Sequence, residues 1–212
     1  MDTELEVAEE AERKAADLHH VGPENGVGAT IWARAAQDIL ALHESARERF
    51  AANTADLEVW ERLHGTAFML VVAVEQVLAF EQRVQRLTGD AELAKARERF
   101  DAVCPDAKDL RDLVAHLDDY AVGSGWRQLP TDEGMPPSLS ERNLYPFPFW
   151  MGDAGEVRGT YLDLGDKRLN LGDAARAATE LAQVVERVRS KHLARVEQEA
   201  NDARRRWFEG HT

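Results

Sequence analysis

The sequence contains only one cysteine, Cys104, so it cannot form an internal disulfide. No CxxC pair is present and no histidine neighbours Cys104, which favours a buried, inert thiol in a reducing compartment. A chain of 212 residues buries roughly 70% of its unfolded surface without help from disulfides or a metal. We therefore expect a cytoplasmic protein with a single folded domain over residues 1–212.

Long apolar runs are also missing. The longest uninterrupted one, from Ala67 to Val74, is far shorter than the roughly 20 residues that span a bilayer. The chain begins with acidic residues, Asp2 and Glu4, where a secretory signal would carry basic ones. The sequence therefore predicts no membrane partner.

Basic charge is scarce. There are 26 Lys and Arg residues against 39 Asp and Glu, which gives a net charge of −13. Such a surface repels nucleic acid at long range, so any contact with RNA must be local. The basic run Arg204 to Arg206 lies among acidic residues and is typical of a solvated helix face.

Motifs for metals and nucleotides are lacking as well. The glycines between Gly22 and Gly28 form neither a GxGxxG nor a Walker pattern. His43 lacks the second histidine four residues later that a zincin needs, and His19 and His20 point about 100° apart on a helix. We therefore expect no metal and no cofactor.

Helical periodicity dominates what is present. Apolar residues recur every three or four positions on both sides of a segment rich in Gly and Pro, which predicts a mainly α fold, a helical bundle. The expected helices, which run approximately between these limits, cover residues 4–19, 30–50, 54–87 or 56–87, 90–103, 106–122 and 173–208. They form an N-terminal helix and turn (1–28), a helical core (30–122) and a long C-terminal helix (172–208).

The expected interruption covers residues 123–171 and combines a loop with a small β-hairpin insertion near residues 143–171. Prolines confine the aromatic segment Tyr145 to Trp150 to an edge strand. Residues 157–164 alternate as a partner strand does, and 168–171 is a candidate third strand. The aromatic side chains either stack on bases or, as we favour, cover the helical core.

One short helix carries a functional motif, Lys108 to Tyr120. Arg111 is followed directly by the polar Asp112 and, after four intervening residues, by His116. This pattern resembles the RxxxxH motif of HEPN domains, and the resemblance covers residues 30–122. It implies a compact helical bundle in which Arg111, Asp112 and His116 line a dimer cleft that cuts RNA without metal, as in toxin or defence systems.

The chemistry suits these residue types. Histidine supplies a base near neutral pH for attack by the RNA 2′-OH, and arginine holds the phosphate bidentately. On an ideal helix Arg111 and His116 lie about 140° apart, so a site needs Arg111 of one protomer beside His116 of another. Asp112 and Tyr120, each four residues from His116, are expected to line the same cleft, with Asp112 orienting the imidazole.

A structural interpretation stays open beside the catalytic one. Arg111 and His116 lie among four aspartates of the same helix and can form local ion pairs with them. Glu75, inside an apolar stretch, either pairs with Arg111 or His116 or marks the exposed strip of its helix. Two function classes follow: a HEPN-like RNA-cleaving or RNA-binding homodimer, with an antitoxin as a possible protein partner, and a non-catalytic helical protein that acts through protein–protein interaction.

Overall fold

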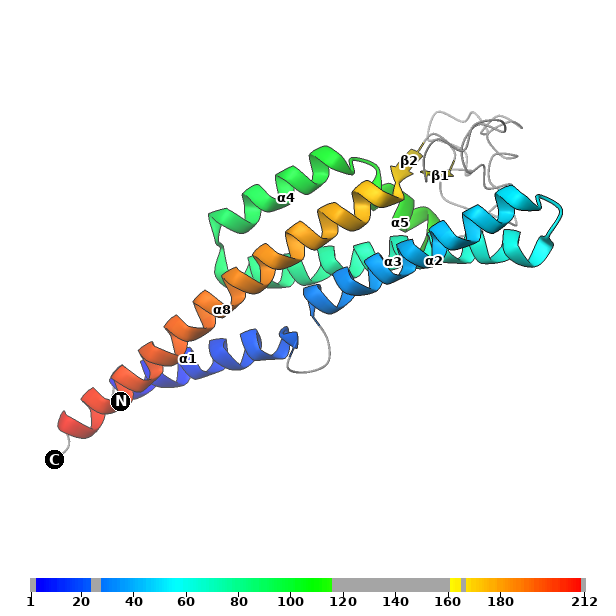
Figure 1. Cartoon of the computed structure of the whole chain (residues 1–212). Coiled ribbons are helices and arrows are strands. Elements are labelled where there is room, and N and C mark those ends of the chain that lie inside the picture. Colours follow the sequence, from blue (N-terminus) through cyan, green and yellow to red (C-terminus); the bar gives the residue numbers. More distant parts are fainter. Residues whose placement is uncertain (1–2, 24–27, 116–160, 165–166, 211–212) are drawn as a thin grey trace, which may run out of the picture. The chain divides into compact units, whose positions relative to one another are not determined.

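The computed structural model describes residues 3–23, 28–115, 161–164 and 167–210. In these residues the fold is mainly helical, with six helices packed as a bundle and one two-stranded antiparallel hairpin (Figure 1). The elements are α1 (Thr3–His20), α2 (Ala29–Ala52), α3 (Leu57–Thr88), α4 (Ala91–Val103), α5 (Ala107–Ala115), β1 (Tyr161–Leu164), β2 (Lys167–Asn170) and α8 (Leu171–Gly210). This confirms the mainly α fold class with a small β-hairpin.

Local chemistry sets the helix limits. Gly89 adopts a positive φ of 61° directly after α3, where a side chain would be strained, and its N–H donates to Gln85 O at 2.8 Å. Asp90 then starts α4, because its Oδ1 accepts a hydrogen bond of 2.8 Å from the Glu92 N–H. The end of one helix near residue 87 and the start of the next at residue 90, both expected from the sequence, are confirmed to within one residue.

The hairpin pairs Tyr161 with Asn170 at one end and Leu164 with Lys167 at the other. Leu162 and Leu169 face each other across the pair and are both buried. β1 coincides with the last four residues of the predicted strand 157–164, whose first four lie outside the described residues, and β2 overlaps the predicted strand 168–171. The expected edge strand from Tyr145 to Trp150 lies outside the described residues.

The chain divides into two compact units. The first contains Met1–Arg34, Gln76–Arg99 and Ala178–Thr212. In this unit α1 and α8 run side by side and antiparallel (Figure 1), since Leu18 O accepts a hydrogen bond of 3.2 Å from Arg189 while Glu4 pairs with Arg206 at 3.0 Å. Small apolar side chains make their contact, with Ala15, Leu18 and Val196 buried against Leu193.

The second unit contains Ala35–Glu75 and Phe100–Ala177. Within it, His43 of α2 lies 3.1 Å from Leu63 O of α3, and α5 contacts β2. Arg111 of α5 pairs with Glu75 of α3. The domain limits expected from the sequence stay a prediction.

The apolar middle of α3, residues 67–74, is buried on most of its sides but not on all of them. Leu70 and Val74 are fully buried, whereas Met69 is 54% exposed. By length and composition, α3 is a helix that could cross a membrane: its most apolar window has a mean hydropathy of 1.7, and 56% of it is buried inside the protein. The core helix of a soluble protein has the same length and composition, so these properties do not distinguish a core helix from a membrane-spanning one.

Candidate functional site

Arg111 is the described member of the motif. Its Nη1 lies 3.3 Å from Oε1 of Glu75, so an ion pair joins α5 to α3. The Arg111 side chain is 38% exposed and that of Glu75 is 23% exposed. Of the alternatives left open for Glu75, the structure shows the pairing with Arg111, and Glu75 is partly rather than fully buried.

The packing of α5 explains why Arg111 lies at this edge. Leu110 is fully buried, so the next residue along the helix lies beside the apolar face, where a long side chain reaches α3 and also meets solvent. Asp109 of α5 pairs instead with Lys167 of β2 at 3.1 Å. The hairpin thus neutralises part of the negative charge that the sequence places around the motif.

The remaining motif residues are not described. Asp112 belongs to α5, but its side chain lies outside the described part of the chain, as do His116 and Tyr120 altogether. The composite cleft between Arg111 and His116 therefore stays a prediction, and so does the role of Asp112 as an orienting group.

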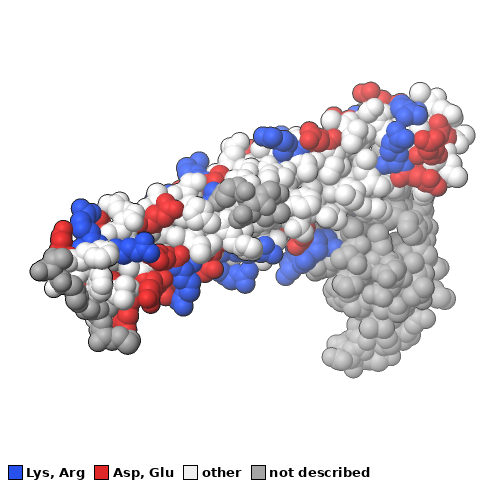
Figure 2. Space-filling view, turned by 90° about the horizontal axis from the view of Figure 1, so that it is seen from below, with Lys and Arg blue, Asp and Glu red and all other residues white. Residues whose placement is uncertain are grey.

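The electrostatic setting shows no broad basic surface in the view of Figure 2, where Lys and Arg alternate with Asp and Glu. No group of three His, Cys, Asp or Glu side chains within the described ranges could hold a metal ion. With a net charge of −13, attraction of a phosphate would depend on individual side chains such as Arg111 rather than on a long-range field.

The sequence analysis did not predict that His43 is buried. His43 is 1% exposed, and its Nδ1 lies 3.1 Å from Leu63 O and 3.0 Å from Thr66 Oγ1. Burial, with smaller contributions from Arg47 and His64, lowers the pKa of His43 to about 4. A neutral ring with its proton on Nδ1 can donate to Leu63 O. A stripe of buried residues on α2, which includes Ala36 and Ala46, is the signal that could have revealed this position.

A second histidine, His192 of α8, joins the beginning of α4. Its Nε2 lies 3.0 Å from Asp90 Oδ2, while Arg195 donates to its Nδ1 over 3.2 Å. Because Nδ1 accepts, the ring proton belongs on Nε2, which donates to the carboxylate. That hydrogen bond is the main reason why the pKa of Asp90 is lowered. The His192–Asp90 hydrogen bond fixes α8 against the start of α4. No spacing of residues in the sequence predicts it.

No protein-family model matches the chain, and neither the curated proteins nor the solved structures contain a significant match. The resemblance to HEPN domains therefore depends on the Arg111-Asp112…His116 sequence pattern, of which the structure describes the side chain of Arg111.

Proposed function

We propose that this protein is a HEPN-like, metal-independent ribonuclease of a toxin or defence type, which acts in the cytoplasm as a homodimer. The observation that supports the proposal is the position of Arg111. A carboxylate of α3 holds its guanidinium at 3.3 Å, and the side chain is still 38% exposed, so it can reach a phosphate. Glu75 would then be a positioning residue that restricts the rotamers of Arg111.

In this proposal the RNA supplies its own nucleophile. His116 of one protomer takes the proton of a 2′-OH, and Arg111 of the other protomer holds the scissile phosphate through two N–H donors. The 2′-oxygen bonds to phosphorus to give a 2′,3′-cyclic phosphate, the P–O5′ bond breaks, and the leaving 5′-oxygen takes up a proton. Asp112 keeps the imidazole in the tautomer that accepts the proton, and Tyr120 lines the same cleft.

The same ion pair also favours a second candidate, a non-catalytic helical protein that acts through protein–protein interaction. Here Arg111 serves only as the counter-charge of Glu75, and the motif has no substrate. The pair is partly exposed, so this role is worth no more than about 1 kcal/mol rather than the larger value of a fully buried pair.

Cleavage of single-stranded RNA in EDTA tests the first candidate. Wild-type protein should cut the RNA, and His116→Ala and Arg111→Ala should each lower the rate at least about 100-fold, because each removes a group that acts on the reacting atoms. Arg62→Ala is the control: Arg62 also pairs with a glutamate of α3, Glu58, over 3.1 Å, its loss costs little stability because the pair is exposed, and it lies outside the motif. Cleavage that survives both motif substitutions would reject the proposal.

Two further measurements separate the candidates. Light scattering at tens of micromolar should show a dimer that contacts through Lys108 to Tyr120, and a monomer would remove the composite site. If Arg111 is only a counter-charge, the wild type is inactive and Glu75→Gln restores the stability that Arg111→Ala loses. A double-mutant cycle over Arg111 and Glu75 measures that coupling directly.

A further inference from the structure

The direction in which Arg111 points depends on how α5 is held. Leu110 is fully buried, and Arg111 beside it pairs with Glu75 of α3 at 3.3 Å. These two contacts involve adjacent residues, so together they hold one edge of the helix. A further contact joins the start of α5 to β2, which belongs to the same compact unit.

The contact with β2 is made by one lysine. Lys167 Nζ lies 3.3 Å from Asp106 Oδ1 and 3.1 Å from Asp109 Oδ2, so a single ammonium group joins two carboxylates. We call this arrangement the lysine bridge. The backbone N–H of Arg168 also donates to Asp106 Oδ2 over 3.1 Å. The Lys167 side chain is only 22% exposed, so solvent screens these pairs less than it screens pairs on the open surface.

The hairpin that carries Lys167 is itself anchored. Leu162 and Leu169 face each other across the two strands, and both are buried. β2 ends at Asn170, whose Oδ1 accepts a hydrogen bond of 3.0 Å from the Asp173 N–H at the start of α8. Because it is fixed at these points, the hairpin can serve as a support for α5.

The lysine bridge and the Arg111–Glu75 pair act on opposite sides of α5. Asp109 and Arg111 are two residues apart, which places them about 200° apart around the helix axis. Asp109 faces the hairpin and Arg111 faces α3. A helix that is held on both sides cannot turn about its axis without breaking one of these contacts. Loss of the lysine bridge would permit that rotation and would change the direction of Arg111.

We propose that Lys167 is a positioning residue for the RNA-cleaving motif: by joining Asp106 and Asp109 it fixes the orientation of α5 and therefore of the Arg111 guanidinium. This role rests on the proposed ribonuclease function, whereas the lysine bridge itself does not. Lys167 acts only through α5 and touches no reacting atom. Its effects on the helix and on RNA cleavage can therefore be measured separately.

Amide hydrogen exchange, followed by NMR, tests the lysine bridge without RNA. Lys167→Met keeps the aliphatic stem and removes the charge. Amides of α5, such as the Leu110 N–H that donates to Asp106 O, should exchange about tenfold faster in this variant, because local opening of the helix becomes easier. Lys167→Arg can still join two carboxylates and should restore slow exchange. Asp109→Asn, which removes one of the two pairs, serves if Lys167→Met does not fold.

Two outcomes of the exchange experiment would overturn the proposal. Unchanged exchange of α5 in Lys167→Met, or in Asp109→Asn where that variant is used, would show that the bridge does not hold the helix. Equal acceleration of α5 and of the buried middle of α3 would show that the substitution lowers the stability of the whole fold, so that Lys167 has no specific effect on α5.

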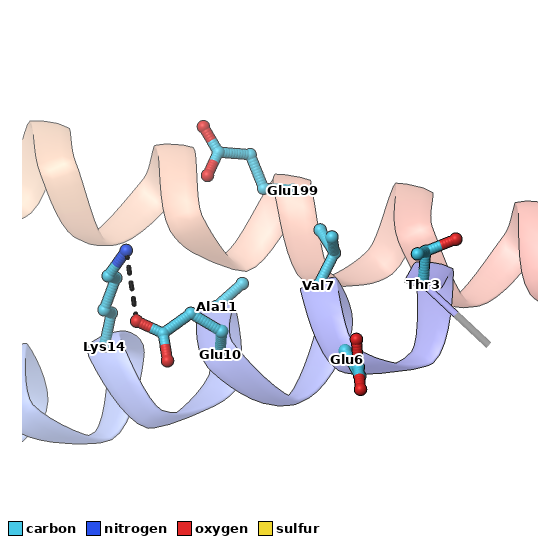
Figure 3. Close-up of a pocket in the computed structure, with 7 residues that line it drawn as sticks. All are labelled: Thr3, Glu6, Val7, Glu10, Ala11, Lys14 and Glu199. Atoms are coloured by element: carbon cyan, nitrogen blue, oxygen red, sulfur yellow. Dashed lines mark ion pairs between the residues drawn. The ribbon is translucent and has the colours of Figure 1, made fainter. Parts of the chain in front are cut away.

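Lys14→Met is the matched control. Lys14 pairs with Glu10 of α1 at 3.3 Å, as the dashed line in Figure 3 marks, and belongs to the other compact unit. The substitution removes the same charge from a lysine ion pair and should leave the exchange of α5 unchanged. Faster exchange of α5 in both variants would be an effect of net charge and would overturn the proposal.

RNA cleavage tests the positioning role. Lys167→Met should cut single-stranded RNA about tenfold more slowly than the wild type, because Arg111 is then poorly oriented, and Lys167→Arg should recover most of the rate. A normal rate in Lys167→Met, despite faster exchange of α5, would overturn the positioning role alone. A wild type that cuts no RNA would reject the proposed function and the positioning role with it, and the exchange of α5 would still decide whether the lysine bridge holds the helix.

Discussion

Acid should destabilise this protein through His43. The imidazole is 1% exposed between α2 and α3, and the structure lowers its pKa from 6.5 to about 4 by burial. Below pH 6.5 the unfolded chain takes up a proton at His43 that the folded chain does not accept. The free energy of unfolding therefore falls as the pH drops from 6.5, and the loss is complete near pH 4.

The size of the effect follows from the two pKa values. A difference of one pH unit corresponds to about 1.4 kcal/mol, so the gap between 6.5 and about 4 amounts to about 3 kcal/mol. The free energy of unfolding of a typical domain is about 5–15 kcal/mol, so this loss is a large part of it. Arg47 and His64, the charged or titratable groups that add to the shift, act in the same direction but less strongly than burial.

The measurement is urea unfolding at a series of pH values between about 7 and 4, for wild type and His43→Gln. Glutamine keeps an N–H donor for Leu63 O and does not titrate, so the difference between the two proteins isolates His43. Wild type should lose about 3 kcal/mol relative to the variant over this range. His20→Gln, at the exposed end of α1, controls for the loss of a histidine as such. A difference that stays constant with pH would refute the assignment of a buried neutral imidazole.

Two other predictions concern buried groups. Burial, reinforced by Asp173 and Asp101, raises the pKa of the Cys104 thiol to about 12. A thiol reagent at pH 8 should therefore label Cys104 only after denaturation. Rapid labelling of the folded protein would contradict this. In urea unfolding, Arg97→Ala should lower the free energy of unfolding by about 3 kcal/mol, because its partner Glu81 is 4% exposed. Arg13→Ala, which removes an exposed ion pair, should lower it by less than about 1 kcal/mol. Equal losses would show that burial does not set the contribution of these pairs.

Local patterns predicted the helices well because helix limits depend on neighbouring residues. The stop at Gly89 and the cap at Asp90 follow from backbone conformation and from a side chain two positions from its donor. The pairing of Glu75 with Arg111 was among the alternatives that the sequence offered, since a buried carboxylate in an apolar stretch needs a partner on an adjacent helix.

Contacts between distant segments were not predictable. His192 and Asp90 are 102 positions apart, and nothing in the local pattern of either one points to the other. The same holds for Lys167, which reaches from β2 to Asp109 of α5. Such pairs depend on how whole elements pack, which one sequence does not specify by spacing. For the candidate site, the sequence offered both Arg111 and His116 as partners of Glu75, and the packing of α5 on α3 decides for Arg111.

The pairing of the first helix with the last has a consequence for synthesis on the ribosome. Leu18 and Arg189, which share a hydrogen bond, are separated by 171 positions. At about 5–20 residues per second, the buried stripe of α1 must wait about 10–30 s for its partner to be made. During that interval the stripe exposes mainly alanines, such as Ala8, Ala11 and Ala15, which attract other apolar surfaces only weakly. The alanine-rich contact thus makes a late-forming interface tolerable for a chain that is still being translated.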